Sequence, residues 1–202
     1  MRYGVLGTGT VGRTLASKLA ELGHEVRIGS RTAGEDTVEF ADAAAFGEVV
    51  VNATAGAHSL EVLRSAGAGS LNGKLLIDVA NALDFSHGMP PVLAFCNDTS
   101  LGEQIQDEFP GARVVKTLNT VNAGVMVDPA LVGGDSDVFV CGNDDSAKEE
   151  VSRLLGDFGW KRVLDLGDIT AARATEMYLI LWLRLFQSSG TPHVNVKVVA
   201  GA

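Results

Sequence analysis

The first fourteen residues constrain the fold more than any other stretch of this chain. An apolar run at residues 2–6 leads into a Gly-x-Gly-x-x-Gly turn, and a helical pattern of apolar residues follows. In this motif the first glycine permits the turn, the second lets a pyrophosphate approach the backbone, and the third lets the helix pack on the strand. The first helical turn then directs its amide groups at the anion. The stretch predicts a dinucleotide-binding strand–turn–helix whose contacts are Gly7, Thr8, Gly9, Thr10, Val11 and Gly12.

The end of the second expected strand, residues 25–29, indicates which dinucleotide is bound. In an NAD-binding protein this point, about 20 residues past the glycines, usually carries an acidic residue for the ribose 2′-hydroxyl. This chain has Ser30, Arg31 and Thr32 there. A guanidinium can pair with a 2′-phosphate, and the two hydroxyls can donate hydrogen bonds to it. The three residues predict NADP in preference to NAD; in the alternative interpretation Arg31 is an ordinary surface arginine.

Composition limits the class of protein. A chain of 202 residues that is 46% hydrophobic and 20% charged can bury a sizeable core. Its net charge of −9, without a basic block, argues against nucleic acid and anionic membranes as partners. Cys96 and Cys141 have no C-x-x-C spacing, and we expect buried thiols in a reducing cytoplasm. A strand is expected directly after residue 1, so no signal peptide is expected. The apolar run at residues 177–183 is too short to span a bilayer.

Apolar runs alternate with helical patterns along the chain, which is typical of a doubly wound, mainly parallel α/β sheet of the Rossmann type. Strands are expected at residues 2–6, 25–29, 48–52, 74–79, 112–117, 137–141 and 162–165. Helices are expected at 36–45, from 59, at 100–109, up to 155 and at 171–186. Without a linker or repeat, residues 1–202 are interpreted as one NADP-binding domain. Its final helix and extended tail, about 171–202, would cover the site or a dimer interface.

One stretch, residues 85–97, is irregular and contains Met89-Pro90-Pro91. The paired prolines exclude a regular helix there. A loop of this length in a compact domain is often an active-site cover, but a plain connection is an equal alternative.

The later strand ends carry small and neutral polar residues, at 53–58, 79–81 and 119–123. Ligands of open α/β sheets bind at such ends, so a dinucleotide would find hydrogen-bonding partners there. His58 is the best candidate titrating group, either as a contact to the cofactor or second substrate or as a helix-start residue bonded to the backbone. The sequence offers no evident acid–base pair, nucleophile or metal-ligand spacing, so we expect no catalytic side chain and no metal. Hydride transfer between two redox cofactors requires positioning rather than acid–base groups.

Several motifs together resemble one family. They are Gly-Ser-Arg at 29–31, Thr-Ala-Gly-Ala-His at 54–58, Asp-Val-Phe-Val-Cys-Gly-Asn-Asp-Asp at 137–145, Asp-Leu-Gly at 165–167, Ala-Arg at 172–173 and Glu176. Over nearly its whole length the chain resembles the coenzyme-F420-dependent NADP oxidoreductases, which move a hydride between NADP(H) and an 8-hydroxy-5-deazaflavin.

The resemblance implies a set of cofactor contacts. NADP would be held by Thr8, Thr10, Val11, Ser30, Arg31, Thr54, Ala55, His58 and Ala80. The nicotinamide and the deazaflavin would be surrounded by Val121, Leu179 and Val194. We add Asn81 and Asn119 as residues at the same strand ends.

The chain departs from the family pattern at a few positions. Ala55 stands where an Ile-Pro turn is common, and Asn119 and Asn122 replace a His and a Pro. Residues 116–120 are more similar to the reductase domain of the STEAP metalloreductases, which pass hydride from NADPH to a flavin. A flavin or metal reductase, and a regulatory protein that binds NADP without turnover, therefore remain as alternatives.

The last helix also carries an expectation about assembly. Its apolar residues wrap most of the helix, whereas a single packed face needs only a stripe. The sheet can cover one side, and a second subunit is the simplest cover for the other. The sequence therefore predicts a homodimer built on Leu179, Leu181, Trp182, Leu183, Leu185 and Phe186.

Overall fold

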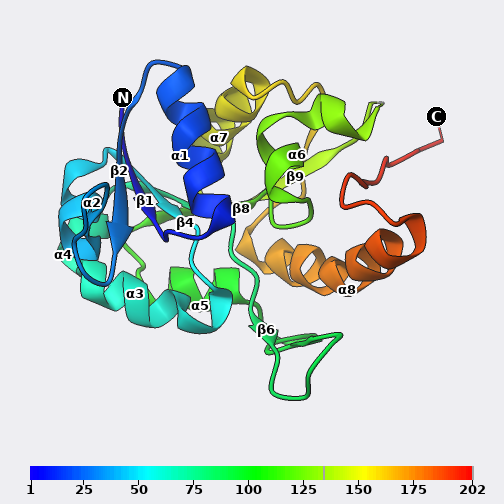
Figure 1. The fold of residues 1–202 in the computed structure, drawn as a ribbon, viewed down its shortest axis with the longest axis horizontal. Helices are drawn as coiled ribbons and strands as arrows, with labels where there is room; N and C mark the ends of the chain where they lie inside the picture. The colour runs from blue at the N-terminus through cyan, green and yellow to red at the C-terminus, as the bar shows by residue number, and fades with distance from the viewer. Residues whose placement is uncertain (134, 202) are drawn as a thin grey trace.

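The computed structural model describes residues 1–133 and 135–201 (Figure 1). At its centre lies an eight-stranded sheet with the strand order β10-β9-β8-β5-β4-β1-β2-β3. Neighbouring strands pair in parallel apart from β8 and β9, which are antiparallel. The predicted fold class, a doubly wound and mainly parallel α/β sheet of the Rossmann type, is confirmed.

The strands of this sheet are β1 (Arg2–Leu6), β2 (Glu25–Ser30), β3 (Val38–Glu39), β4 (Val49–Asn52), β5 (Leu75–Asp78), β8 (Arg113–Thr117), β9 (Val138–Cys141) and β10 (Val163–Asp165). A separate hairpin pairs β6 (Leu83–Asp84) with β7 (Val92–Leu93). The α-helices are α1 (Thr10–Glu21), α2 (Phe40–Phe46), α3 (Ser59–Ala66), α4 (Ala68–Leu71), α5 (Leu101–Glu108), α6 (Ala123–Val127), α7 (Asp145–Asp157) and α8 (Ala172–Ser189). Short 3₁₀ turns span Gly56–His58, Pro129–Val132 and Ile169–Ala171.

Both faces of the sheet are buried, because helices cover each of them. In Figure 1, α1 and α7 lie on one side of the strands, and α3 and α5 lie on the other. Successive residues of β1 serve different faces: Val5 belongs to the apolar cluster that contains Leu15 of α1, and Leu6 to the cluster that contains Leu63 of α3. This alternation explains why the central strands consist of continuous apolar runs.

The helix expected at 36–45 begins later than predicted. Val38 and Glu39 form the edge strand β3 instead, because they pair in parallel with Gly29 and Ser30 at the end of β2. The helix α2 starts only at Phe40. Tertiary pairing thus overrides the helical pattern at this position.

The irregular stretch at 85–97 contains more structure than expected. Val92 and Leu93 within it form β7, which pairs with β6 just before the stretch, and the loop between the two strands extends away from the sheet in Figure 1. Phe85 and Met89 in this loop are exposed.

The expectation that both cysteines are buried is wrong for one of them. Cys96 is exposed, because it follows β7 in an irregular segment outside the sheet. Cys141 is buried in β9, and this burial raises the pKa of its thiol to about 12. Within the single chain, the apolar run at 177–183 is only partly buried, since Ile180 and Leu181 are exposed. In the part of the chain that the structure describes, no helix combines the length and apolar character that crossing a membrane requires.

Candidate cofactor-binding site

The turn between β1 and α1 has the shape that the glycine motif predicts. Gly7 has a φ of +121°, and a Cβ there would lie 2.5 Å from the Ala53 carbonyl oxygen. A Cβ on Gly12 would collide with the Gly7 carbonyl, so the third glycine does allow close packing. At Gly9 a Cβ would meet nothing within 4 Å.

The helix that follows this turn is ready to bind an anion. Gly9 is the N-cap of α1, and among the described residues no side chain accepts a hydrogen bond from the first amide groups. These amides and the positive end of the helix dipole therefore face the open space beside Gly9. The residues present fit the pyrophosphate of a dinucleotide.

The predicted contacts lie at the carboxyl ends of five adjacent strands, β2, β1, β4, β5 and β8, which we name the strand-end row. Backbone hydrogen bonds join its members: the Gly7 amide donates to the Gly29 carbonyl (3.0 Å), and the Ala53 amide donates to the Leu6 carbonyl (2.9 Å). From β2 to β8 the row carries Ser30, Arg31 and Thr32, then Gly7 to Gly12, then Thr54, Ala55 and His58, then Ala80 and Asn81, then Asn119 and Val121.

At the β2 end of the row, Ser30 and Arg31 differ in availability. The Ser30 hydroxyl hydrogen-bonds within its own loop, to the Thr37 hydroxyl at 3.2 Å and to the Thr32 carbonyl. Arg31 is exposed and forms no ion pair among residues 1–133 and 135–201. Ser30 therefore shapes the loop, while the charge of Arg31 is available to a ligand.

A second guanidinium near this loop was missed by the sequence analysis. Arg13, in the first turn of α1, donates from Nε to the Thr8 carbonyl (3.2 Å), and its Nη1 lies 2.5 Å from Asp36 Oδ2. The hydrogen bond with Arg13 holds the pKa of Asp36 below its usual value. The position of Arg13 directly after the third glycine was the available signal. Its partner Asp36 depends on how the loop folds, which the sequence does not reveal.

At the β4 end, Thr54 is fixed by buried side chains. Its hydroxyl donates to Asn52 Oδ1 (2.7 Å), and Asn52 Nδ2 donates to Asp78 Oδ1 (2.8 Å) and to Ser59 Oγ (3.0 Å). Asn52, Ser59 and Asp78 are all buried. The β4 and β5 ends are thereby held in one arrangement.

His58 follows the same strand end. Its main-chain amide donates to the Ala55 carbonyl (2.8 Å), as expected of a helix-start residue. Its ring is exposed, with Nδ1 3.8 Å from the Glu61 carboxylate. The ring is accessible to a ligand, and its contact with the cofactor stays a prediction.

Beneath the β5 and β8 ends lies a buried ion cluster of Lys116, Asp78 and Glu176. Lys116 Nζ lies 2.8 Å from Asp78 Oδ2 and 3.0 Å from Glu176 Oε1, and it donates to the Ala80 carbonyl at 2.5 Å. The side chains of Lys116 and Asp78 are 0% exposed, and that of Glu176 is 5% exposed. Burial alone would lower the pKa of Lys116, but the two carboxylates outweigh it and the pKa is raised.

The sequence analysis missed this cluster. Lys116 lies in one apolar strand and Glu176 in the apolar last helix, far apart along the chain. A charge inside each apolar run was the only signal. Because the cluster is buried, it does not reach the open side of the strand-end row.

The two predicted asparagines of the row contact each other. Asn81 Nδ2 donates to the Asn119 carbonyl (2.8 Å), and Asn119 Nδ2 donates to Asn81 Oδ1 (3.1 Å) and to the Thr175 carbonyl of α8 (3.1 Å). Leu179 follows Thr175 by one helical turn on the same face and is buried. The structure thus brings Leu179 near the β8 end of the row.

The segment after β8 has an orphaned polar atom. Leu118 has a φ of +59°, which is uncommon for a residue with a side chain. Val121 and Thr120 are both buried, and the Thr120 hydroxyl has no hydrogen-bond partner within the described residues. Most buried hydroxyls are hydrogen-bonded, so Thr120 stands out at this strand end.

The C-terminal tail, residues 191–201, folds back on its own chain. The Val194 carbonyl accepts from Trp182 Nε1 of α8 (3.2 Å), and the Val196 carbonyl accepts from the Asp137 amide (3.0 Å). Val194 is therefore held between α8 and the start of β9.

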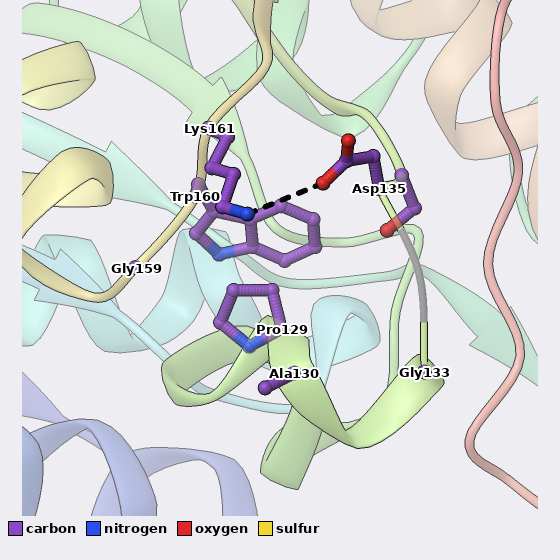
Figure 2. A pocket seen from close by; sticks show the side chains of 8 residues that line it. Pro129, Ala130, Gly133, Asp135, Gly159, Trp160 and Lys161 are labelled. Carbon is purple, nitrogen blue, oxygen red and sulfur yellow. Dashed lines mark hydrogen bonds and ion pairs between the residues drawn. The ribbon is translucent and has the colours of Figure 1, made fainter.

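A separate hollow of about 240 Å³ lies beside the 3₁₀ turn Pro129–Val132. Figure 2 shows Pro129 and Trp160 facing it, with Lys161 Nζ 3.5 Å from Asp135 Oδ1 at its rim. No predicted cofactor contact lines this hollow. The strand-end row remains the better candidate site, because ligands of open α/β sheets bind at the carboxyl ends of the strands.

Comparison with known proteins identifies the family of this chain. Residues 2–82 match the family described as NADP oxidoreductase, coenzyme F420-dependent. The crystal structure of a proposed F420-dependent NADP reductase from Arthrobacter sp. FB24 superposes with a TM-score of 0.95 and 53% identity, covering 99% of this chain and 100% of that one.

Two curated relatives extend the comparison. The F420-dependent NADP reductase of Methanocaldococcus jannaschii is 28% identical, over 95% of this chain and 96% of its own length. The metalloreductase STEAP3 of Rattus norvegicus is 30% identical over 95% of this chain, which spans only 38% of that protein. The chain belongs to the F420-dependent NADP oxidoreductase family and is an NADP-dependent oxidoreductase.

Proposed function

We propose that this protein transfers a hydride between NADP(H) and a deazaflavin of the F420 type, with residues 1–202 acting as one NADP-binding unit. The observation that carries the proposal is the strand-end row, which runs unbroken from the charged residue Arg31 past the open turn at Gly9 to Asn119. The membership of the chain in an F420-dependent family supports the choice of a deazaflavin as the second carrier.

Each part of the row has a role in this proposal. The α1 amides beside Gly9 hold the pyrophosphate, and Arg31 reads the 2′-phosphate with Ser30 and Thr32 around it. Thr54, Ala55, His58, Ala80 and Asn81 follow the nucleotide along the row. When bound, NADPH supplies the hydride.

The β8 end of the row would hold the reacting rings. Asn119 and Val121 contact the nicotinamide, and Leu179 and Val194 bound the space for the deazaflavin. The support for this placement is that Asn119 is hydrogen-bonded to α8, the helix that carries Leu179 and whose Trp182 is bonded to Val194.

The chemistry of the row agrees with two carriers that exchange a hydride. Besides the exposed Arg31 at its β2 end, the row carries amides, hydroxyls and one exposed imidazole, while the charged groups near Ala80 are buried. Oxidation of an alcohol would require a general base at the substrate, whereas hydride exchange between cofactors depends on alignment of the two rings.

The test is to mix the purified protein with NADPH and F420, and in parallel with FMN or FAD, while following NADPH absorbance. We expect oxidation with F420. Oxidation with a flavin alone would support a flavin or metal reductase, an alternative favoured by the similarity to STEAP3. Tight NADPH binding without oxidation by any carrier would support a regulatory protein.

We also propose a homodimer in the cytoplasm. Ile180, Leu181 and Phe186 leave an apolar stretch of α8 exposed, with Leu181 53% accessible, and a second copy would cover it. The free thiols of Cys96 and Cys141 suit a reducing compartment. Light scattering at micromolar concentration should give the mass of a dimer, and a monomer mass would contradict this assembly.

A further inference from the structure

The ion cluster of Lys116, Asp78 and Glu176 holds one positive and two negative charges. We propose that it places net negative charge beneath the nicotinamide end of the NADP site and so favours the oxidised, cationic nicotinamide over the reduced, neutral one. The inference rests on the proposed NADP site and extends it, because it concerns which redox form of the cofactor the site prefers.

The hydrogen bonds determine the charge state of Lys116. An ammonium group has three N–H donors and no acceptor, and Lys116 Nζ faces three acceptors, from Asp78, Glu176 and the Ala80 carbonyl. A neutral amine would present a lone pair to one of these oxygens. Lys116 is therefore protonated.

Both carboxylates accept hydrogen bonds from several donors besides Lys116. Asp78 Oδ1 accepts from Asn52 Nδ2 (2.8 Å) and from the Ala80 amide (3.2 Å). Glu176 accepts from two amides at the start of α5, those of Leu101 (2.8 Å) and Gly102 (3.0 Å). Donors of this kind favour the ionised form of a carboxylate, so both groups carry their negative charge.

The position of the cluster decides which part of the cofactor it acts on. Asp78 ends β5, and Lys116 is bonded to the Ala80 carbonyl, next to Asn81. The exposed guanidiniums of Arg13 and Arg31 lie at the β1 and β2 ends of the row, and Arg173 on α8 is paired with Glu103. The net charge of the cluster is therefore left at the β5–β8 end.

The consequence for the reaction follows from charge balance. NADPH gives up a hydride, which carries two electrons and one proton, to the acceptor, and the nicotinamide ring is left as a cation. A buried negative charge near that ring stabilises the product, because burial keeps screening by water and salt weak. The positive end of α5 offsets part of the Glu176 charge, so the effect is moderate.

The competing explanation is that the cluster only fastens α5 and α8 to the sheet. The two explanations differ in the ratio of the dissociation constants for NADP⁺ and NADPH, which a fastening role leaves unchanged. Calorimetric titration of both cofactors measures this ratio without any electron acceptor. The result is therefore independent of whether F420 is the second carrier.

The test variant is Glu176→Gln, which removes one negative charge at nearly constant shape. We expect NADP⁺ affinity to fall roughly three- to tenfold relative to NADPH affinity. Glu176→Asp, which keeps the charge, should retain the wild-type ratio. The matched control is Glu103→Gln, because the Glu103–Arg173 pair joins the same two helices outside the cluster. It should leave the ratio unchanged.

Equal weakening of both cofactors by Glu176→Gln would overturn the inference in favour of fastening. If this variant does not fold, Asp78→Asn removes the other negative charge and should likewise raise the NADP⁺ dissociation constant relative to that of NADPH. The wild-type protein gives a test without any variant, since it should bind NADP⁺ more tightly than NADPH, and the reverse preference would overturn the inference. A folded wild-type protein that binds neither cofactor would instead refute the proposed NADP site itself.

Discussion

The two ends of the strand-end row are built in opposite ways. At the β1–β2 end, neighbours in sequence form the Gly7–Gly12 turn, whose middle residues are exposed, and the exposed Arg31 follows the adjacent strand β2. At the β5–β8 end, residues far apart in sequence meet around the buried Lys116. The comparison teaches that one half of the site is a local motif placed on the sheet, whereas the other half exists only when the whole fold is assembled.

The comparison predicts that the β5–β8 end dominates stability, and Lys116→Met is the strongest test. The variant leaves Asp78 and Glu176 buried together without their cation, which should cost about 3–5 kcal/mol of unfolding free energy. Urea unfolding measures the loss. The control is Lys161→Met, because Lys161 is paired with Asp135 on the surface. This variant should lower the free energy of unfolding by less than about 1 kcal/mol. Equal losses in the two variants would break the comparison.

The β1–β2 end should dominate recognition instead. Arg31→Ala is expected to cost roughly 1.5–3 kcal/mol of NADPH binding, because a charge-assisted contact to the 2′-phosphate is lost. NADH binding should barely change, and neither should stability, since Arg31 is exposed. Ser30→Ala should weaken NADPH binding less. Calorimetric titration of both variants with NADPH and NADH measures these affinities. An equal loss of affinity for the two cofactors in Arg31→Ala would identify Arg31 as a platform for adenine.

Gly9→Ala separates binding from folding within the glycine turn. A Cβ at Gly9 meets nothing within 4 Å, so thermal unfolding should be nearly unchanged. The same Cβ would occupy the space proposed for the pyrophosphate, and NADPH affinity should fall on the order of tenfold, or about 1.4 kcal/mol. Gly12→Ala is the contrasting variant, because its Cβ would collide with the Gly7 carbonyl and should reduce stability as well. An unchanged NADPH affinity in Gly9→Ala would refute this placement.

The smallest effect is expected at Thr120. Its buried hydroxyl has no partner among the described residues, so Thr120→Val removes an unsatisfied group and should leave stability equal or raise it by up to about 1 kcal/mol. If the hydroxyl binds the nicotinamide end of the cofactor, NADPH affinity falls while the affinity for 2′,5′-ADP, which lacks that end, is retained. A clear loss of stability would instead show that the hydroxyl has a partner in the folded protein.

The difference between the local β1–β2 end and the long-range β5–β8 end also explains which features could be predicted from the sequence. The glycine turn, the strand at residues 25–29 and the Ser30–Arg31 pair are signals within short windows, and the structure places them as expected. The edge strand β3 was missed because pairing with β2 overrides the local helical pattern.

Patterns within short windows of sequence could not predict which side chains that are far apart along the chain contact each other. Nothing in the window around Lys116 indicates that Asp78 and Glu176 meet it, and Asp36 reaches Arg13 only because its loop folds back. Asn81 and Asn119 were predicted as separate strand-end residues, but their mutual hydrogen bonds depend on β5 and β8 being neighbours in the sheet.

The ion cluster also has a consequence for the order in which the protein is made. Synthesis proceeds from the N-terminal side, so β1 to β10 leave the ribosome before Glu176 does. Until α8 docks, Lys116 lacks one of its acceptors, and the Leu101 and Gly102 amides lack theirs. A nascent chain that already contains the glycine turn therefore still holds incompletely paired polar groups at its centre, and only α8, which is translated after the strands of the sheet, completes them.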